Sequence, residues 1–281
     1  MTTIEQPATP SAPERQRPVE IAPDTFVIQA SLGAPGAPQV VHMNSMVIRA
    51  AEPVVVDTGC SVHRDTYLED LFSLVDPDDV RWVFISHDDA DHYGNLAAVL
   101  EACPGATVVG TWFLGERLAA EGLVPPPTRW RWVGDGETFT AGDRTLAAVR
   151  PPLYDSPTTR GLFDPTTGVY WASDCFATPV PRPTTFVEEL DADAWAGGFA
   201  AFQAWNSPWA ALVDRDRYAA ECARLEALGI SAIATAHGPT VARGQVGEAF
   251  ELLRAVPSVE APPQPGQPLL DEIVRSLGGA A

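Results

Sequence analysis

The chain has 281 residues, of which 46% are hydrophobic, and its 37 acidic side chains outnumber 18 basic ones, giving a formal net charge of -19 at pH 7. Such a charge repels phosphate backbones, so we expect no nucleic-acid partner. No apolar run approaches the roughly 18 residues of a membrane-spanning helix, and the first residues lack a signal pattern, so we expect a cytoplasmic protein with no membrane partner.

The two ends of the chain differ in composition from its middle. Residues 1–24 are rich in Pro, Thr, Ala and Glu, which predicts a disordered N-terminal segment. Residues 25–256 hold enough apolar residues for one large core, and we expect them to form a single domain. Residues 257–281 start with a proline-rich stretch and end in an amphipathic run, which predicts a linker followed by a short C-terminal helix.

Between these ends, short apolar runs typical of strands alternate with longer runs of helical periodicity. The pattern predicts strands at Val40–Ile48, Val54–Asp57, Trp82–Ser86, Thr107–Gly110, Thr145–Val149, Val169–Ser173 and Ile230–Thr235. It predicts helices at Asn95–Ala102, Trp112–Ala120, Asp214–Leu228 and Gly244–Val256. This alternation indicates a layered α/β protein.

Directly after the strand predicted at Trp82–Ser86, one short segment contains four potential metal ligands: His87, Asp89, Asp91 and His92. Alternate residues of an extended segment point the same way, so the first three can converge on one pocket, and the fourth joins them as the chain turns. Carboxylates and imidazoles crowded at the end of a buried strand repel one another unless a cation coordinates them. The segment predicts a site for two metal ions, and an acidic surface loop is the alternative.

A third histidine repeats this arrangement, because His237 follows the apolar run Ile230–Ile233. Together with Asn44, Ser45 and the strand and turn Val54–Gly59, the order of motifs resembles the metallo-β-lactamase fold. Among its branches the chain is most similar to the diiron domain of flavodiiron proteins and their stand-alone oxygen-binding relatives. Several motifs in order are more specific than any one of them. The resemblance implies an αββα sandwich of two mixed β-sheets with outer helices.

The resemblance also implies a set of ligands. Hydrolases of this fold carry His-x-His-x-Asp-His, and this chain has Asp89 at the second histidine, where flavodiiron proteins have Glu. Aligning the proline that follows the family's mid-chain histidine places Asp155 at that histidine, with Tyr154 as an alternative. The bridging aspartate of the family falls on Asp174, and its last ligand falls on His237.

Carried over in this way, one metal would be held by His87, Asp89, Asp155 and Asp174. The other would be held by Asp91, His92, Asp174 and His237, with Asp174 shared and a solvent oxygen bridging the two ions. Oxygen-rich sites with some imidazole suit iron or manganese, so we expect iron, with manganese or zinc as alternatives. Asp91 and Asp174 are the residues that we expect to take part in catalysis.

The function implied by the resemblance is a non-haem diiron protein that binds or reduces dioxygen or nitric oxide. The segment after Val256 is too short for the flavodoxin domain that feeds electrons in full flavodiiron proteins, so we expect a separate electron donor. The alternative is a dinuclear metallohydrolase of an ester, lactone or thioester, in which Asp91 orients a metal-bound water. A degenerate site kept for binding or structure is a third hypothesis, and the chain could act as a homodimer.

Two aromatic stretches, Trp112–Trp132 and Pro179–Trp209, are candidates for the rims of the pocket, although tryptophans at such spacing commonly pack in a core. The four cysteines are widely spaced without a Cys-x-x-Cys pair, so neither a zinc knuckle nor a disulfide framework is expected. Cys175 follows Asp174 directly, and we expect it to be a small buried hydrophobe.

Overall fold

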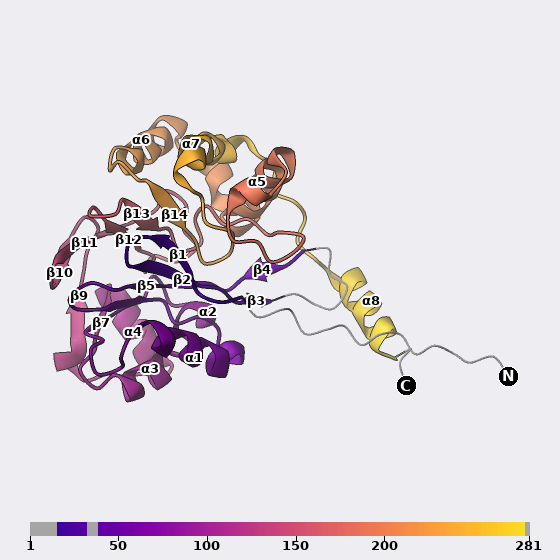
Figure 1. Cartoon of the computed structure of the whole chain (residues 1–281). Coiled ribbons are helices and arrows are strands. Elements are labelled where there is room, and N and C mark those ends of the chain that lie inside the picture. The colour runs from indigo at the N-terminus through magenta and orange to yellow at the C-terminus, as the bar shows by residue number, and fades with distance from the viewer. Residues whose placement is uncertain (1–15, 33–38, 279–281) are drawn as a thin grey trace.

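The computed structural model describes residues 16–32 and 39–278, which form two β-sheets packed face to face (Figure 1). The first sheet has seven strands in the order β1-β2-β5-β6-β7-β8-β9. They are β1 Val19–Ala22, β2 Thr25–Ile28, β5 Ser45–Ile48, β6 Val54–Val56, β7 Trp82–Phe84, β8 Thr107–Gly110 and β9 Trp130–Trp132. Strands β1 to β6 pair antiparallel, and β6 to β9 pair parallel.

The second sheet has five strands that lie in chain order, from β10 to β14. They are β10 Thr138–Ala141, β11 Arg144–Val149, β12 Gly161–Asp164, β13 Val169–Trp171 and β14 Ala232–Ala234. All neighbours pair antiparallel except β13 and β14, which are parallel. A separate two-stranded hairpin joins β3 Ser31–Leu32 to β4 Val41–His42.

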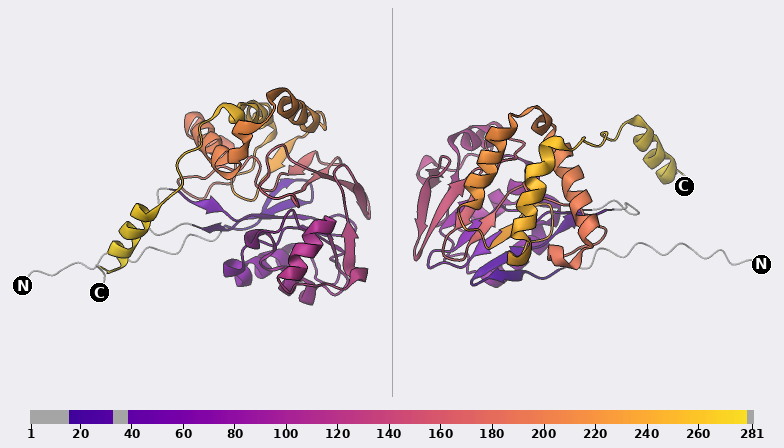
Figure 2. Two further views of the ribbon diagram at one scale, coloured as in Figure 1. Left: turned by 180° about the vertical axis from the view of Figure 1, so that it is seen from behind. Right: turned by 90° about the horizontal axis from the view of Figure 1, so that it is seen from above.

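Helices cover the outer face of each sheet. Figures 1 and 2 show α1, α3 and α4 against the first sheet and α5, α6 and α7 against the second. The α-helices are α1 Arg64–Leu74, α2 Ala90–Tyr93, α3 Leu96–Ala102, α4 Trp112–Ala120, α5 Ala192–Asn206, α6 Arg215–Glu226, α7 Val246–Ala255 and α8 Gln267–Gly278. Short 3-10 helices lie at Ser61–His63, Pro127–Arg129, Val187–Glu189, Pro208–Leu212, Arg243–Gln245 and Val256–Ser258.

The two sheets and the helices on their outer faces form four layers, and an apolar cluster fills each of the three spaces between them. Alternation along β6 shows how they form, because Val55 packs toward α1 and α3 while Val54 and Val56 pack toward the second sheet. Trp171 of β13 belongs to the cluster between the sheets, and Tyr170 beside it belongs to the cluster under α5 to α7. The αββα sandwich of two mixed sheets with outer helices is therefore confirmed.

The predicted strands and helices are present, and one predicted strand is divided. Strand β8 and helix α4 have the predicted bounds, β11 starts one residue earlier at Arg144, and the other undivided elements are shorter than predicted. Val40–Ile48 is split into β4 and β5, and Asn44 lies at the break. The side-chain amide of Asn44 donates to the carbonyl oxygens of Thr235 at 3.0 Å and Gly238 at 2.9 Å. The break thus ties the first sheet to the loop that carries His237.

The structure contains further helices and strands that the sequence pattern did not predict, because their residues lack apolar periodicity or disfavour the element. Helix α1 is mostly polar, and α5 contains Gly197 and Gly198, which disfavour a helix. Asp191 begins α5 by accepting a hydrogen bond from the backbone N–H of Ala194 at 3.0 Å, and the buried rings of Trp195 and Phe199 hold it on the second sheet. Strands β1, β2, β9, β10 and β12 are likewise short additions to the predicted set.

The two chain ends depart from the expected boundaries. Disorder is predicted up to residue 24, but β1 pairs with β2 from Val19 onward, so ordered chain begins before residue 25. Residues 1–15 lie outside the described part. At the other end, α8 follows the proline-rich linker, starts before the predicted run, and projects from the sandwich with Leu269, Leu270 and Val274 exposed (Figure 2).

Candidate metal centre

The predicted ligands meet beyond the ends of the parallel strands. His87, Asp174 and His237 each follow a strand at the same offset, since β7 ends at Phe84, β13 at Trp171 and β14 at Ala234. Strands β13 and β14 are parallel neighbours in the second sheet, so equal offsets bring Asp174 and His237 to one edge of that sheet. Strand β7 belongs to the first sheet, and the ion pair between His87 and Asp174 shows that its end meets the same edge. All seven predicted ligand residues lie in this cluster.

The acidic segment is only partly extended. Asp89 has extended backbone angles, but Asp91 and His92 lie on the single turn of α2, so Asp91 reaches the cluster through a helical turn rather than by strand alternation. The turn is held in place by the backbone N–H of Thr58, which donates to the carbonyl of His92 at 2.6 Å. Gly94 then passes so close to Gly59 that a Cβ would lie 2.8 Å from the Gly59 carbonyl oxygen.

One half of the cluster, position 1, is formed by His87, Asp89, Asp155 and Asp174. Nε2 of His87 lies 3.7 Å from Asp89 Oδ2, 3.8 Å from Asp155 Oδ1 and 4.0 Å from Asp174 Oδ2. Three carboxylates therefore face a single imidazole at distances that leave room for an ion between them.

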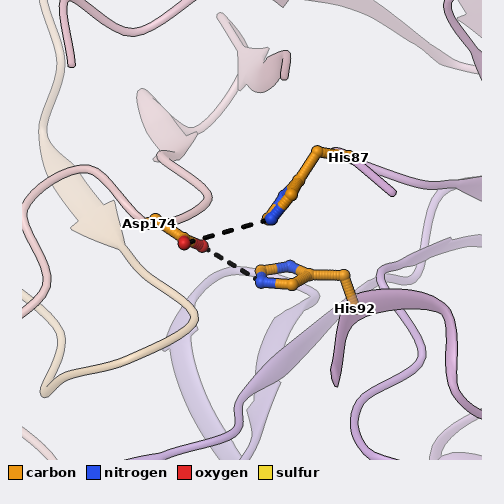
Figure 3. Close-up of side chains that lie close together, drawn as sticks. All are labelled: His87, His92 and Asp174. Carbon is orange, nitrogen blue, oxygen red and sulfur yellow. Dashed lines mark ion pairs between the residues drawn. The ribbon is translucent and has the colours of Figure 1, made fainter. Parts of the chain in front are cut away.

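The other half, position 2, is formed by Asp91, His92, His237 and again Asp174. Oδ1 of Asp174 lies 3.0 Å from His92 Nε2 and 3.3 Å from His237 Nε2, and Asp91 Oδ2 lies 3.4 Å from His237 Nε2. Figure 3 shows the carboxylate of Asp174 between His87 and His92. Its two oxygens thus face different histidines, as a carboxylate shared by two ions would.

Each ligand histidine is oriented by a partner on its far nitrogen. Nδ1 of His87 lies 3.0 Å from Ser173 Oγ, and Nδ1 of His92 lies 2.9 Å from Asp57 Oδ2. Nδ1 of His237 lies 2.8 Å from the carbonyl oxygen of His42. These partners leave every Nε2 directed at the centre of the cluster, which is how proteins orient metal-binding imidazoles.

Asp57 is a positioning residue that sequence reasoning treated only as part of the Asp-Thr-Gly turn. Its carboxylate accepts hydrogen bonds from Ser86 Oγ at 2.7 Å and Trp171 Nε1 at 3.0 Å, in addition to the contact with His92. Ser173 has a similar role, which no motif indicated. Both Asp57 and Ser173 have left-handed backbone angles, with φ of 54° and 56°, a strain that is common at functional sites.

Charge and burial set the protonation of the cluster. Burial would raise the pKa of Asp174, but His237, His87 and His92 hold the pKa of this carboxyl well below its usual value. For His92 the effect of burial is opposite, because burial alone would lower the pKa of an imidazole. The carboxylates of Asp174 and Asp57 nevertheless raise the pKa of His92 well above its usual value. In the metal-free chain the cluster is held together by ion pairs between these groups.

Two buried polar atoms of the cluster indicate that its residues suit metal ions. Among the described residues, Nε2 of His87 and Oδ1 of Asp174 make no hydrogen bond, and the only polar groups near them are the ion-pair partners within the cluster. Buried polar atoms are almost always hydrogen-bonded, so a buried imidazole nitrogen and a buried carboxylate oxygen held by ion pairs alone are unusual. The donor set of carboxylates and imidazoles would be satisfied by divalent cations, and their role as ligands stays a prediction.

The two mid-chain candidates, Asp155 and Tyr154, point in different directions. Asp155 lines the cavity of the cluster. Tyr154 instead lines a separate cavity of about 380 Å³, where its ring packs against Trp209 at 5.3 Å between centroids and the guanidinium of Arg150 lies 5.3 Å from its centroid. Of the two, Asp155 alone faces the other predicted ligands.

Asp88 is a second positioning residue that the prediction passed over, although it stands between two predicted ligands. Its Oδ1 accepts hydrogen bonds from Ser156 Oγ and Thr158 Oγ1, both at 2.6 Å, and its Oδ2 pairs with Arg117 of α4. These hydroxyls lower the pKa of Asp88, against the effect of burial. Asp88 therefore joins the loop of Asp89 to the loop of Asp155.

The cluster opens into a cavity of about 480 Å³. Its apolar wall comes from the β3–β4 hairpin and from α5, and it includes Leu32, Val41, Phe202 and Trp205. The predicted rim Pro179–Trp209 is thus represented by α5, whereas the predicted rim Trp112–Trp132 is wrong, because none of its residues lines this cavity. Trp130 instead packs against the core beneath α4.

The αββα fold is the one that the resemblance to the metallo-β-lactamase fold implies, and comparison with known proteins agrees. Residues 39–153 match the model of the metallo-beta-lactamase superfamily. Within it, the curated relatives are diflavin and flavodiiron proteins. Putative diflavin flavoprotein A 2 of Nostoc sp. is 33% identical over 150 residues, which are 53% of this chain and 26% of the relative.

Further relatives agree with this placement. Diflavin flavoprotein A 1 of Synechocystis sp. is 28% identical over 214 residues, 75% of this chain and 36% of the relative. Rubredoxin oxygen:oxidoreductase of Desulfovibrio gigas has the same fold with a TM-score of 0.73 and 17% identity, over 85% of this chain and 61% of that one. A fragment of putative diflavin flavoprotein A 5 from Nostoc sp. matches over 86% of this chain and 96% of its own length, with a TM-score of 0.67 and 18% identity.

The chain spans about a quarter to a third of the length of the first curated relatives. Within residues 16–32 and 39–278, no helix is long and apolar enough to cross a membrane. The expected homodimer, the cytoplasmic location and the absence of a nucleic-acid partner stay predictions.

Proposed function

We propose that the chain is a non-haem dinuclear metal protein, with iron as the metal, that binds or reduces dioxygen or nitric oxide. The observation that carries the proposal is Asp174, a buried carboxylate whose two oxygens face His87 on one side and His92 and His237 on the other. A single carboxylate can bridge two ions only in such a place. Relatives named nitric oxide reductase, from Moorella thermoacetica, and rubredoxin oxygen:oxidoreductase support the choice of ligand.

Iron is the metal that the donor set favours. The cluster offers carboxylates and imidazoles without thiolate, because none of the four cysteines belongs to the potential metal-binding groups of the described residues. Zinc sites are built mainly from histidine and thiolate, whereas oxygen-rich sites with imidazole suit iron and manganese. The four aspartates also balance the charge of two divalent ions.

The chain's own residues would prepare the site in three ways. Ser173, Asp57 and the carbonyl of His42 fix the histidine rings, so the imidazoles need no reorientation when an ion enters. Asp89 and Asp91 reach the cluster from the solvent side of the cavity, where a small ligand would enter. When bound, the metal pair would supply the redox chemistry and the open coordination positions.

The apolar wall of the cavity suits small uncharged ligands. Phe202 of α5 lies 6.3 Å from the ring of His237, between centroids, and Met43 and Val41 line the same cavity. Such side chains do not solvate ions, but they accommodate dioxygen or nitric oxide at little cost. We propose that electrons come from a separate donor. Hydrolysis of an ester, lactone or thioester is not favoured, because the named activities among the relatives are reductions.

The test is anaerobic reconstitution with Fe²⁺ followed by exposure to dioxygen or nitric oxide in the presence of a chemical reductant. We expect consumption of one of the two gases and a change in the iron absorption spectrum. Asp174→Ala should abolish both, whereas Asp164→Asn, which alters a buried carboxylate outside the cluster, should retain both. An iron-loaded protein whose spectrum is unchanged by either gas would refute the proposal.

A further inference from the structure

The two halves of the metal centre differ in their donors. Position 1 offers one imidazole, from His87, and three carboxylates. Position 2 offers two imidazoles, from His92 and His237, and two carboxylates, of which Asp174 is common to both halves. Position 1 is thus the harder and more negatively charged half of the centre.

The halves also differ in burial and support. At position 2 both imidazoles are almost fully buried, and His92 is backed by the carboxylate of Asp57 at 2.9 Å. A carboxylate behind a ligand histidine makes the imidazole a stronger donor. At position 1 the backing group of His87 is the neutral hydroxyl of Ser173, and the side chain of Asp89 is 57% exposed. Position 2 is the better-supported half.

We propose that the two positions bind different classes of ion. Position 2 fills first and favours ions that prefer imidazole, Fe²⁺ or Zn²⁺, while position 1 fills second and discriminates less against a harder ion such as Mn²⁺. The physical reason is ligand softness, because carboxylate and water suit Mn²⁺ whereas imidazole suits zinc and iron. The inference rests on the proposed dinuclear centre and specifies the metal class of each half.

Asp155 decides the character of position 1. It is the residue that gives this half its third carboxylate, since Asp89 and Asp174 supply the other two. Replacing it with histidine would give position 1 two imidazoles and two carboxylates, the same composition as position 2. The difference between the halves therefore depends on one side chain that can be exchanged.

The experiment titrates the full-length apoprotein separately with Zn²⁺ and with Mn²⁺ by calorimetry under chelator-buffered conditions. For the wild type we expect two resolved binding steps, with the preference for Zn²⁺ over Mn²⁺ at least about tenfold larger in the first step than in the second, a difference of ~1.4 kcal/mol. Two equivalent steps with equal preference would overturn the inference, and this measurement needs no variant.

Variants assign the steps to the positions. Asp155→His should raise the Zn²⁺ preference of the second step alone, and Asp155→Asn, which removes the charge without adding imidazole, should weaken Mn²⁺ binding without a gain for Zn²⁺. His237→Ala should remove the first step and leave the second. If Asp155→His leaves the second step unchanged, or His237→Ala removes the second step instead, the assignment is wrong.

The outcomes separate this inference from the proposed function. Two equivalent binding steps, in a protein that consumes dioxygen or nitric oxide when loaded with iron, would refute the inference and support the function. Two unequal steps in a protein that reacts with neither gas would support the inference and refute the function. Absence of any metal binding by the folded apoprotein would refute both.

Discussion

Two buried carboxylates of the second sheet illustrate what separates a structural group from a metal-binding one. Asp164, at the end of β12, accepts hydrogen bonds from Arg144 at 2.6 Å, from the backbone N–H of Thr166 at 2.9 Å and from Thr167 Oγ1 at 3.0 Å. Asp174, beyond the end of β13, faces imidazoles, and its Oδ1 makes ion pairs with His92 and His237 but no hydrogen bond. A carboxylate saturated by protein donors stabilises the fold, whereas a buried one held by ion pairs alone is available to a cation.

The largest effect is expected when Asp174 is replaced by alanine. Both metal positions share this carboxylate, so the variant should lose most of both ions, as measured by elemental analysis after purification in iron-containing medium. The histidines that pair with Asp174 can become neutral when the carboxylate is removed, so the fold should stay intact, with a circular dichroism spectrum like that of the wild type. A variant that keeps two ions per chain would show that the carboxylate is not shared.

The reverse pattern is expected for Asp164→Ala. The change leaves the guanidinium of Arg144 buried and unpaired, which typically costs about 3–5 kcal/mol of the free energy of unfolding. Metal content should remain that of the wild type. Urea unfolding measures the loss of stability, and elemental analysis of the same preparation measures the metal content. Loss of metal from a folded Asp164→Ala protein would contradict the prediction.

Asp155→Ala should separate the two positions. It removes a ligand of position 1 only, so we expect occupancy to fall by up to one ion per chain without unfolding. The matched control is Tyr154→Phe, since the Tyr154 ring lies in another cavity and should not affect metal content. Unchanged metal content in Asp155→Ala would show that the alignment through the proline is wrong.

Asp88→Asn should have a smaller effect at the same position. Asp88 contacts Ser156 and Thr158, which follow Asp155 in the same loop, so the change should loosen the loop rather than remove a ligand. We expect metal affinity at position 1 to fall by roughly 10-fold to 100-fold, the usual cost of losing an outer-shell partner. Thr158→Val, which removes one of the two hydroxyls, should lie between Asp88→Asn and the wild type, and an equal loss at both positions would rule out this role.

The smallest effect concerns the buried thiols. Burial raises the pKa of Cys103 and of Cys222 to about 11. A thiol is reactive only as thiolate, which is roughly one part in a thousand at pH 8 for such a pKa. Alkylation of these cysteines in the folded protein should therefore be slow at pH 8 and rise toward pH 11. Modification at pH 8 as fast as in the urea-unfolded protein would contradict the burial of these residues.

The sequence predicted the layers of the fold because apolar periodicity depends on local spacing. It missed α5, whose glycines oppose a helix and whose stability comes from packing of Trp195 and Phe199 on the second sheet. It also started the ordered chain too late, because β1 is stabilised by pairing with β2 rather than by its own composition. Such elements depend on contacts between segments that no local pattern displays.

The same distinction holds for the metal centre. Residues that follow strands at equal offsets, such as His87 and His237, could be predicted because strand ends converge in space. Asp155 needed a family resemblance, since its loop has no periodic pattern. Asp88 and Ser173 could not be assigned a role from sequence, because their function lies in hydrogen bonds to partners 68 and 86 residues away.

The most direct test of the account is the metal content of the wild-type protein, purified from medium containing iron and measured by elemental emission against protein concentration. The account predicts two ions per chain, with iron predominant and with both ions removable by a chelator without unfolding. A folded protein that carries less than one ion per chain, even after anaerobic incubation with excess Fe²⁺, would contradict it.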